Sequence, residues 1–462
     1  MIQTRGERRW RTVVFLLGLA LSAAMLVRSQ VRGDQLNMLA RGWLLADKGR
    51  WVPYGVHTSA GGNSPGGLAS LLVGLPLCIW RDYRAPVVPI LLSHIVAYLL
   101  LDYLVKETLG LPHRLVFAVV YWLNPWRLYF SAHLANTNYL FFFGALHAWT
   151  SYRLRSQRRF WDSFFHVIAI TLPFQLHSSA FVLPVVSGLL LYRRALKLDA
   201  VAATCAAVLI AASLVPWLFA AIRNPAILPV GEGFPLRGLI FVFPFLRGIL
   251  YWLRYASLAV CDKMIRFDFP APAGSRFGAL VAFILPWLTE AVADVSVIPA
   301  VAATLWLWRR VRKRNARGAP YRSSGRLWLE EYVACTFVGA AISCALSPTT
   351  FMFWQGLIFF HAAVLPLVLW VTLVLRSRLA PQVRTAARVW AVLAILLALA
   401  ITLRSPMYRS AGPEEASAYR VADHPMLHDL DIGADQSIVI DPGFVSNLPD
   451  LFWPAADRGA HR

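Results

Sequence analysis

Long apolar blocks recur along the chain and are separated by short polar or basic segments. A helix needs about 20 apolar residues to cross a bilayer, and fewer where neighbouring helices bury it. The pattern therefore predicts an all-α polytopic membrane protein with about 11 to 13 transmembrane helices. The strongest candidates are Arg11–Ser29, Ala85–Val105, Arg114–Ser131, Asn138–Tyr152, Asp162–Gln175, Ser178–Tyr192, Asp199–Ala221, Ala291–Trp308, Leu327–Leu346, Phe353–Leu375 and Arg388–Leu403. The weaker candidates are Gly66–Trp80, Gly238–Cys261 and Phe277–Leu288.

Basic clusters between the blocks predict the orientation. They are Arg5–Arg11, Arg153–Arg159, Arg193–Lys197, Arg309–Arg322 and Arg376–Arg388. The positive-inside rule places all five in the cytoplasm, so an even number of crossings separates each pair. Gly66–Trp80 then does not cross and is expected as a helix at the outer surface. The same count puts the first loop, 28–84, and the segment 222–289 outside. The two weak candidates in 222–289 cross together or not at all.

The two ends of the chain differ in character. The basic start precedes the apolar run Val13–Val27 and no clear cleavage site follows, which predicts a retained signal anchor. We expect a transmembrane body over 1–403 and an extracytoplasmic tail over 404–462. The tail holds nine acids against five Arg, and its run Ser437–Ile440 could form one short strand.

Composition supports the membrane assignment. Of 462 residues, 58% are hydrophobic and 15% are charged, whereas a soluble protein carries about 25% charged residues. Lys and Arg number 45 against 24 acids, a formal charge of +21. In a membrane protein this excess indicates topology and anionic lipid partners, and we expect no nucleic-acid partner. The five Cys form no CxxC motif, so no metal or redox site is predicted from them.

The first outer loop holds the main candidate for catalysis. Its apolar residues at 36, 39, 40, 43 and 44 have helical spacing, and Asp34 stands in the first turn, just after the first span. Asp34 either caps this helix or serves as a general base or metal ligand at the membrane boundary. Asn63 follows in a Gly-rich stretch, 58–67, which is either a simple turn or a phosphate-binding loop.

Polar side chains also gather near the outer ends of two later spans. They are Asn124, Arg127, Tyr129, His133, Asn136 and Asn138. Polar and ionisable groups at membrane depth are candidates for a substrate cavity. The alternative is an aromatic belt in which Arg127 snorkels to the surface and the two later Asn residues cap helices. At a further outer turn, Gln355 and His361 are weaker candidates for the same cavity.

Arginines in 222–289 fit an anionic ligand. Arg247 and Arg254 lie two helical turns apart among aromatic residues. With Arg127, they are candidates to bind a donor phosphate, because Arg is suited to that group. Anchoring to anionic lipid is the alternative. Five more outer cations are a further sign of an anionic ligand: Arg28, Arg32, Arg41, Lys48 and Arg50.

Several short motifs together suggest a family. They are the Asp34 helix directly after the first span, Ser64-Pro65-Gly66-Gly67-Leu68, Asn124-Pro125-x-x-x-Tyr129-x-Ser131, and Asn136-Thr137-Asn138-Tyr139-Leu140. Over roughly residues 10 to 155 the chain resembles the GT-C class of integral membrane glycosyltransferases, of the protein O-mannosyltransferase and aminoarabinose transferase type. The resemblance implies a GT-C-like bundle with outer amphipathic helices and a sugar donor linked to polyprenyl phosphate. It also implies a carboxylate that deprotonates the acceptor, with inversion at the sugar, and Asp34 matches that carboxylate.

The chain departs from this family in two places. The acid pair often seen in the first loop is Asp34-Gln35 here, and a second acid expected near the fourth span is replaced by the Asn136–Asn138 group. Amides bind divalent cations less well than carboxylates, so no metal site is assigned and dependence on a divalent metal is doubtful. An altered or inactive relative is also compatible with the sequence.

Three functions follow from these observations. The leading one is a glycosyltransferase of the bacterial inner membrane, active on the extracytoplasmic face. Its donor is a polyprenyl-phosphate sugar and its acceptor is a glycan, lipid or protein. The second is a transporter or flippase for a lipid-linked sugar. It fits less well, since the spans hold few charges and no internal repeat is visible. The third is a ligase or polymerase of a surface polysaccharide, relying on outer Arg and His residues.

Overall fold

The computed structural model describes residues 5–27, 29, 34–58, 62–228, 242–259, 276–316, 324–347, 351–375 and 377–404. The α-helices are α1 (Arg5–Val27), α2 (Asp34–Lys48), α3 (Leu68–Ile79), α4 (Val87–Leu109), α5 (Pro112–Phe117), α6 (Pro125–Phe130), α7 (Leu140–Arg153), α8 (Phe160–Thr171), α9 (Val182–Tyr192), α10 (Ala200–Arg223), α12 (Val242–Tyr255), α13 (Arg276–Val295), α14 (Val297–Ala316), α15 (Gly325–Leu346), α16 (Phe360–Val374) and α17 (Ala380–Arg404). Short π or 3-10 helices are η1 (Ala118–Trp122), η2 (Asn136–Tyr139), η3 (Leu172–Gln175), η4 (Ser178–Phe181), η5 (Pro225–Ile227) and η6 (Gln355–Phe359). The strands are β1 (Tyr54–His57) and β2 (Asn63–Pro65).

Seven helices of the described ranges are long and apolar enough to cross a membrane. They are Gly6–Val27, Val87–Leu109, Ala200–Arg223, Glu290–Ala316, Gly325–Leu346, Gln355–Val374 and Ala380–Thr402. Each corresponds to one of the strongest predicted spans. The chain is an all-α polytopic integral membrane protein, as its hydrophobic pattern predicts.

The other four strong candidates are helices interrupted by turns of different pitch. The π-helix η1 separates α5 from α6, and 3-10 turns adjoin α7, α8 and α9. Proline contributes to two of these breaks, because Pro125 begins α6 and Pro173 lies in the first turn of η3. Neighbouring helices pack around these short segments, α7 for example against α4 and α8. A short apolar helix is stable in a membrane protein when its neighbours bury it.

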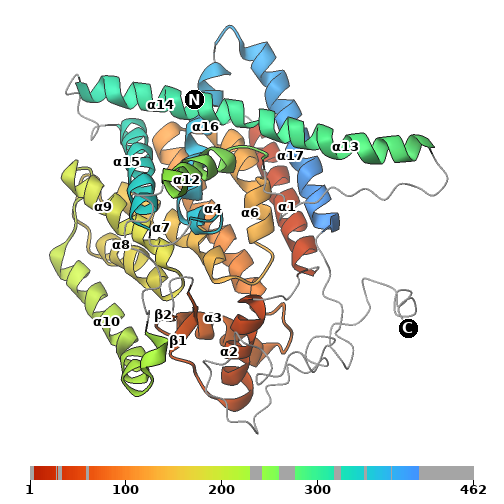
Figure 1. Cartoon of the computed structure of the whole chain (residues 1–462). Helices are drawn as coiled ribbons and strands as arrows, with labels where there is room; N and C mark the ends of the chain where they lie inside the picture. The colour runs from red at the N-terminus through yellow and green to blue at the C-terminus, as the bar shows by residue number, and fades with distance from the viewer. Residues whose placement is uncertain are drawn as a thin grey trace.

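A compact unit connects α1 to α4; it is called the outer unit below because the topology prediction places it outside. α2 and α3 pack on one another and the hairpin β1–β2 lies beside them, at the end of the bundle opposite to the N-terminus (Figure 1). The strands are antiparallel, with Tyr54 opposite Pro65 and His57 opposite Asn63. The sequence predicted a turn here but no strands, because the pairing residues lack the usual alternation. α3 has 12 residues, as the prediction of a helix that does not cross requires.

Three of the basic clusters meet at one end of the bundle. The Lys197 amide donates to the Leu154 carbonyl at 2.9 Å, which joins the clusters at 153–159 and 193–197. Arg193 and Arg314 both pair with the buried Glu331, at 2.8 and 2.5 Å, which adds the cluster at 309–322. These contacts agree with the prediction that the clusters share one side of the membrane.

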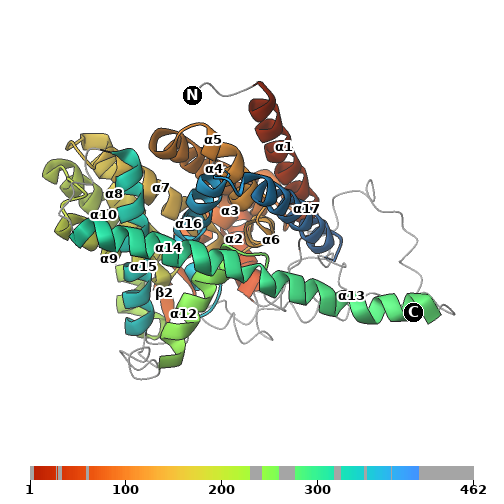
Figure 2. The ribbon, with the colours of Figure 1, turned by 90° about the horizontal axis from the view of Figure 1, so that it is seen from above.

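The segment after α10 includes helices of different kinds. α12 has 14 residues, fewer than a crossing needs, and packs on α14, α15 and α16. α13 and α14 lie nearly end to end across one end of the bundle (Figure 1), and α13 projects beyond it (Figure 2). Residues 405–462, which hold nearly all of the predicted tail and its strand Ser437–Ile440, lie outside the described ranges.

Candidate functional site

Asp34, the predicted catalytic residue, is the first residue of α2. Its side chain lies outside the described part of the structure, so its role stays a prediction. The helix behind it is well fixed, because Leu39 and Leu44 are buried. Two glycines let α2 and α3 approach closely: a Cβ on Gly42 would lie 2.4 Å from Val73 Cγ1 on α3. The predicted helical spacing is therefore confirmed, and α2 is held against α3 along its buried face.

A buried cation lies on the same helix. Arg41 Nε donates to Asn37 Oδ1 at 2.6 Å, and the guanidinium lies 5.2 Å from the centre of the Tyr54 ring. Arg41 is one of the five outer cations noted in the sequence, and these contacts join α2 to β1. A cation buried in this way supplies a fixed positive charge near the start of the outer unit.

The hairpin is held by Asn63 of β2 and by the glycine that follows the strand. Asn63 is buried and its Nδ2 donates to the Gly55 carbonyl at 3.1 Å, which stabilises the hairpin. Gly66 has φ of +80°, and a Cβ there would lie 2.4 Å from Gln175 Oε1 on η3. The Gln175 amide in turn donates to Ser213 Oγ at 2.7 Å. The stretch 62–67 is therefore a packed joint between the hairpin and η3.

The Asn-Pro motif organises the end of the predicted segment Arg114–Ser131. Asn124 caps α6, its Oδ1 accepting from the Trp126 amide at 2.9 Å, and Pro125 occupies the first helical position. The Asn124 Nδ2 group donates to the Tyr255 carbonyl at 2.8 Å. One side chain thus both starts α6 and joins it to the end of α12, which the sequence did not predict.

Arg127 is fully buried in a nest of carbonyl and hydroxyl groups. Its Nε donates to the Trp122 carbonyl at 2.9 Å, and its Nη1 donates to Ser22 Oγ of α1 at 2.8 Å. The guanidinium lies 3.8 Å from the centre of the Trp122 ring. Trp122 itself fits against Gly18, where a Cβ would be 2.4 Å from its Nε1. These contacts join α1 to α6; binding of a donor phosphate by Arg127 stays a prediction, and these contacts do not support it.

His133 and its neighbours form a polar group in the turn between α6 and η2. The His133 Nδ1 atom donates to the Tyr129 carbonyl at 2.9 Å, and the rings of these residues lie 4.7 Å apart. Asn138, which is buried, donates from Nδ2 to the His133 carbonyl at 2.7 Å. Asn136 donates to the Leu176 carbonyl at 2.5 Å. The structure thus brings four predicted residues together near the turn that follows η3.

Burial determines the protonation of this histidine. It lowers the pKa of His133 to about 4, from 6.5. His133 is therefore neutral at pH 7. Because Nδ1 donates to a carbonyl, the neutral ring carries its lone pair on Nε2. A pKa this far below 7 makes Nε2 a weak base, so the ring is suited to accepting a hydrogen bond from a substrate and not to removing its proton.

The two remaining predicted arginines both lie on α12. Arg247 and Arg254 are both partly buried, and Arg247 Nε donates to the Tyr251 hydroxyl at 2.9 Å. Tyr255, on the same helix, donates to the Phe353 carbonyl. Gln355 is buried nearby in the chain, with its Oε1 accepting from the Met352 amide at 2.7 Å. α12 therefore lies between the Asn124 turn and the turn at 351–355.

Reasoning from sequence missed a buried chain of histidines. Ser187 Oγ on α9 is 2.9 Å from His147 Nε2 on α7 and 3.0 Å from His166 Nε2 on α8. The Tyr332 hydroxyl on α15 continues the chain, 3.0 Å from both His147 Nδ1 and His361 Nε2 on α16. The residues come from five helices, so no local motif could have indicated it. His361, a candidate for the substrate cavity, belongs to this network.

No group of His, Cys, Asp or Glu among the described residues could hold a metal ion. The histidines of the buried chain are separated by hydroxyl groups and do not converge on one point. The side chain of Asp34 lies outside that search, so metal dependence at that position stays untested.

The overall fold is shared with a known transferase structure. A crystal structure of ArnT from Cupriavidus metallidurans bound to undecaprenyl phosphate matches with a TM-score of 0.50 and 13% identity, over 94% of this chain and 84% of that one. The apo structure of the same protein gives 0.49 and 12%, over 89% and 79%. No family model and no curated protein sequence matches. At this identity the comparison shows the fold, which is the GT-C-like fold that the motifs predicted.

Proposed function

We propose that this protein is a membrane glycosyltransferase that moves a sugar from a polyprenyl-phosphate donor to an acceptor, on the extracytoplasmic face of a bacterial inner membrane. The observation that carries the proposal is the fold: 94% of the chain matches ArnT, and that structure binds undecaprenyl phosphate. The position of Asp34 supports it, because α2 begins with this residue soon after α1 ends.

The reaction assigns a role to each group. The Asp34 carboxylate takes the proton of the acceptor, and the acceptor atom attacks the anomeric carbon of the sugar. The bond from that carbon to the phosphate oxygen breaks, with inversion, and the lipid phosphate leaves as an anion. Arg247 and Arg254 are our candidates to stabilise this developing charge, since both are on one helix and only partly buried.

The remaining predicted residues fit a supporting role. Asn124 and Arg127 hold α6 against α12 and α1, and so shape the outer end of the bundle. The group of Tyr129, His133, Asn136 and Asn138 lies beside that end and is our candidate lining for the acceptor side of the cavity. The hairpin that contains Asn63 would close the cavity from the side of η3.

Asp34→Asn tests the proposal directly. The variant keeps the shape of the side chain but cannot accept a proton, and loss of a general base typically costs 10² to 10⁴-fold in rate. The matched control is Asp47→Asn on the same helix, where the carboxylate pairs with Lys48 at 3.0 Å. The measurement is sugar transfer from polyprenyl-phosphate sugars by the purified protein. Equal activity of the Asp34 variant and the wild type would contradict the assignment.

A comparison of variants distinguishes the polysaccharide ligase hypothesis from the proposed glycosyltransferase. A ligase relying on outer Arg and His residues would tolerate Asp34→Asn but lose activity in His133→Ala and Arg254→Ala. Our proposal expects the opposite order for Asp34 and His133. A transporter of lipid-linked sugars would move the labelled donor across proteoliposome membranes without any sugar transfer.

A further inference from the structure

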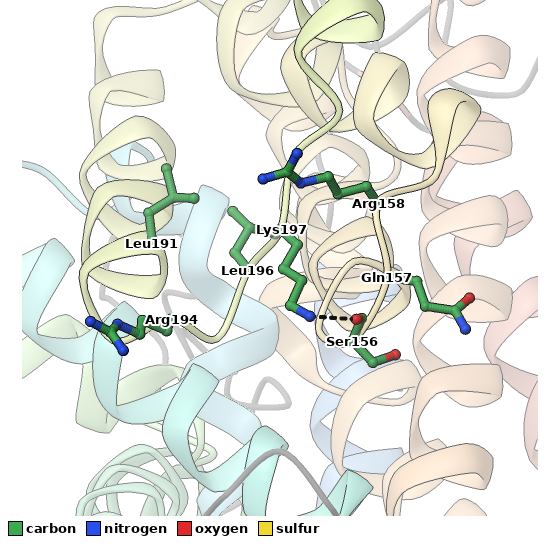
Figure 3. Close-up of a pocket in the computed structure, with 7 residues that line it drawn as sticks. All are labelled: Ser156, Gln157, Arg158, Leu191, Arg194, Leu196 and Lys197. Atoms are coloured by element: carbon green, nitrogen blue, oxygen red, sulfur yellow. Dashed lines mark hydrogen bonds between the residues drawn. The ribbon is translucent and has the colours of Figure 1, made fainter.

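A hollow lies at the other end of the molecule from the proposed active site. It has a volume of about 600 Å³ and opens between the loop that joins α7 to α8 and the loop that joins α9 to α10 (Figure 3). α9 begins at η4, which packs on η3 next to the hairpin, so the end of α9 faces the opposite side. The lining residues are Ser156, Gln157, Arg158, Leu191, Arg194, Leu196 and Lys197.

The hollow is positively charged. Three of its lining residues are cations and none is an acid. Within the described ranges, Arg158, Arg194 and Lys197 take part in no ion pair. The nearest acid on α8, Asp162, is paired with Arg153 at 3.2 Å, and Asp199 accepts from the Ala202 amide at the start of α10. The three cations are therefore left to attract an anion from outside the protein.

Its walls are fixed to one another. The Lys197 amide donates to the Leu154 carbonyl at 2.9 Å, and the Lys197 Nζ group donates to the Ser156 carbonyl at 2.8 Å. Two separate loops are thus joined through one residue, and Leu196 is buried between them. An anion that enters this hollow meets cations whose backbone positions are already set, which lowers the entropy lost on binding.

Arg194 occupies a position that normally favours glycine. Its φ is +54°, the one left-handed residue other than glycine in the described part of the chain. The Arg194 amide donates to the Leu191 carbonyl at 2.8 Å and the Ala195 amide to the Leu190 carbonyl at 2.7 Å. These two bonds are the Schellman ending of a helix, in which glycine is preferred at this place because a Cβ is strained there. An arginine in such a strained conformation is a candidate for a functional role of its charge.

Apolar side chains place the hollow at the level of the membrane surface. Leu191 is 43% exposed and Tyr192 83%, both in the last turn of α9. Trp161, 65% exposed, stands in the first turn of α8 on the other side. Exposed aromatic residues at helix ends are typical of the boundary between lipid headgroups and acyl chains. A ligand here can place its charge on the cations and its chain along α9.

We propose that this hollow binds the anionic headgroup of a phospholipid from the leaflet on that side. The phosphate would lie among Arg158, Arg194 and Lys197, with an acyl chain along Leu191 and Tyr192. Basic pockets between transmembrane helices are known to suit such headgroups. The inference is independent of the proposed transferase activity, because it involves none of the same residues.

The test uses the full-length protein in nanodiscs of phosphatidylcholine, to which phosphatidylglycerol is added, with bound lipid counted by native mass spectrometry. Removing one cation near the membrane surface should weaken binding about fivefold. Arg194→Gly is the sharpest variant, since it removes the charge and also relieves the backbone. It should bind phosphatidylglycerol about fivefold more weakly, yet unfold in pure phosphatidylcholine at the same or a higher temperature. Adding Lys197→Gln should weaken binding about fivefold again.

The matched control is Arg384→Gln with Arg388→Gln, two exposed arginines of α17 in another basic cluster. This control should keep wild-type binding; an equal loss in it would mean nonspecific charge attraction and would overturn the site. Equal binding of phosphatidylglycerol and phosphatidylcholine would also overturn it. Glycerol phosphate and inorganic phosphate are added as free anions. Displacement of the lipid by either at similar concentration would overturn the assignment to a lipid headgroup.

Discussion

At the scale of single residues, the polar groups inside the membrane body mostly hold helices together. Arg127 is the clearest case, because its donors reach Trp122 and the hydroxyl of Ser22 on another helix. A hydrogen bond that involves a charged group contributes about 1.5 to 3 kcal/mol to stability. A polar residue at membrane depth is therefore a candidate for packing as well as for catalysis.

Arg127→Lys should reduce stability by about 2 kcal/mol, because an ammonium group cannot reproduce the planar contacts of the guanidinium. Thermal unfolding of the purified protein in detergent measures this change, with Arg254→Lys on the partly buried face of α12 as control. Unchanged stability together with weaker donor binding would instead support the phosphate role predicted from the sequence.

At the scale of elements, two glycines in left-handed conformations shape the turns of the outer unit. Gly49 and Gly66 both have positive φ, +61° and +80°. Gly49 has open space where a Cβ would be, whereas a Cβ on Gly66 would meet the Gln175 side chain. An alanine at Gly49 therefore tests backbone strain alone, whereas an alanine at Gly66 tests backbone strain together with loss of packing.

Gly49→Ala should cost about 1 kcal/mol, the price of a Cβ in a left-handed conformation. Gly66→Ala should cost at least about 1 kcal/mol more, since Gln175 must move and its hydrogen bond to Ser213 is lost. Thermal unfolding of the two variants gives the difference directly. Equal destabilisation would show that the joint between the hairpin and η3 yields easily and does not fix the outer unit.

At the scale of the whole molecule, the charge distribution and the fold indicate the same orientation across the membrane. The outer unit with α2 and the hairpin lies at one end, and three basic clusters meet at the other (Figure 1). The positive-inside rule assigns the basic end to the cytoplasm. The division into a body over 1–403 and a tail over 404–462 stays a prediction.

This orientation can be measured with single cysteines in a variant that lacks the native ones. The two cysteines are introduced as Arg50→Cys and Gln157→Cys. Position 50 is exposed just after α2, and position 157 is exposed in the loop between α7 and α8. A thiol reagent that cannot cross membranes should label the first in intact cells and the second only after the membrane is opened. Labelling of position 157 in intact cells would reverse the topology and remove the extracytoplasmic active site.

The sequence by itself determined the helical spans, the amphipathic helix that begins at Asp34 and the helix α12 with its two arginines. Each of these depends on neighbouring residues in the sequence. A run of about 20 apolar residues is stable in a bilayer as a helix, and helical spacing of apolar residues is visible in a short stretch of sequence.

Only the tertiary structure decided what the buried polar groups do. Arg127 donates to Ser22 on α1, and His147 contacts His166 through Ser187 on a third helix. These partners lie far apart in the chain, and a hydrogen bond between them forms only because packing brings the helices together. Hydrophobic pattern determines which segments enter the membrane, and the buried polar groups determine how those segments fit against one another.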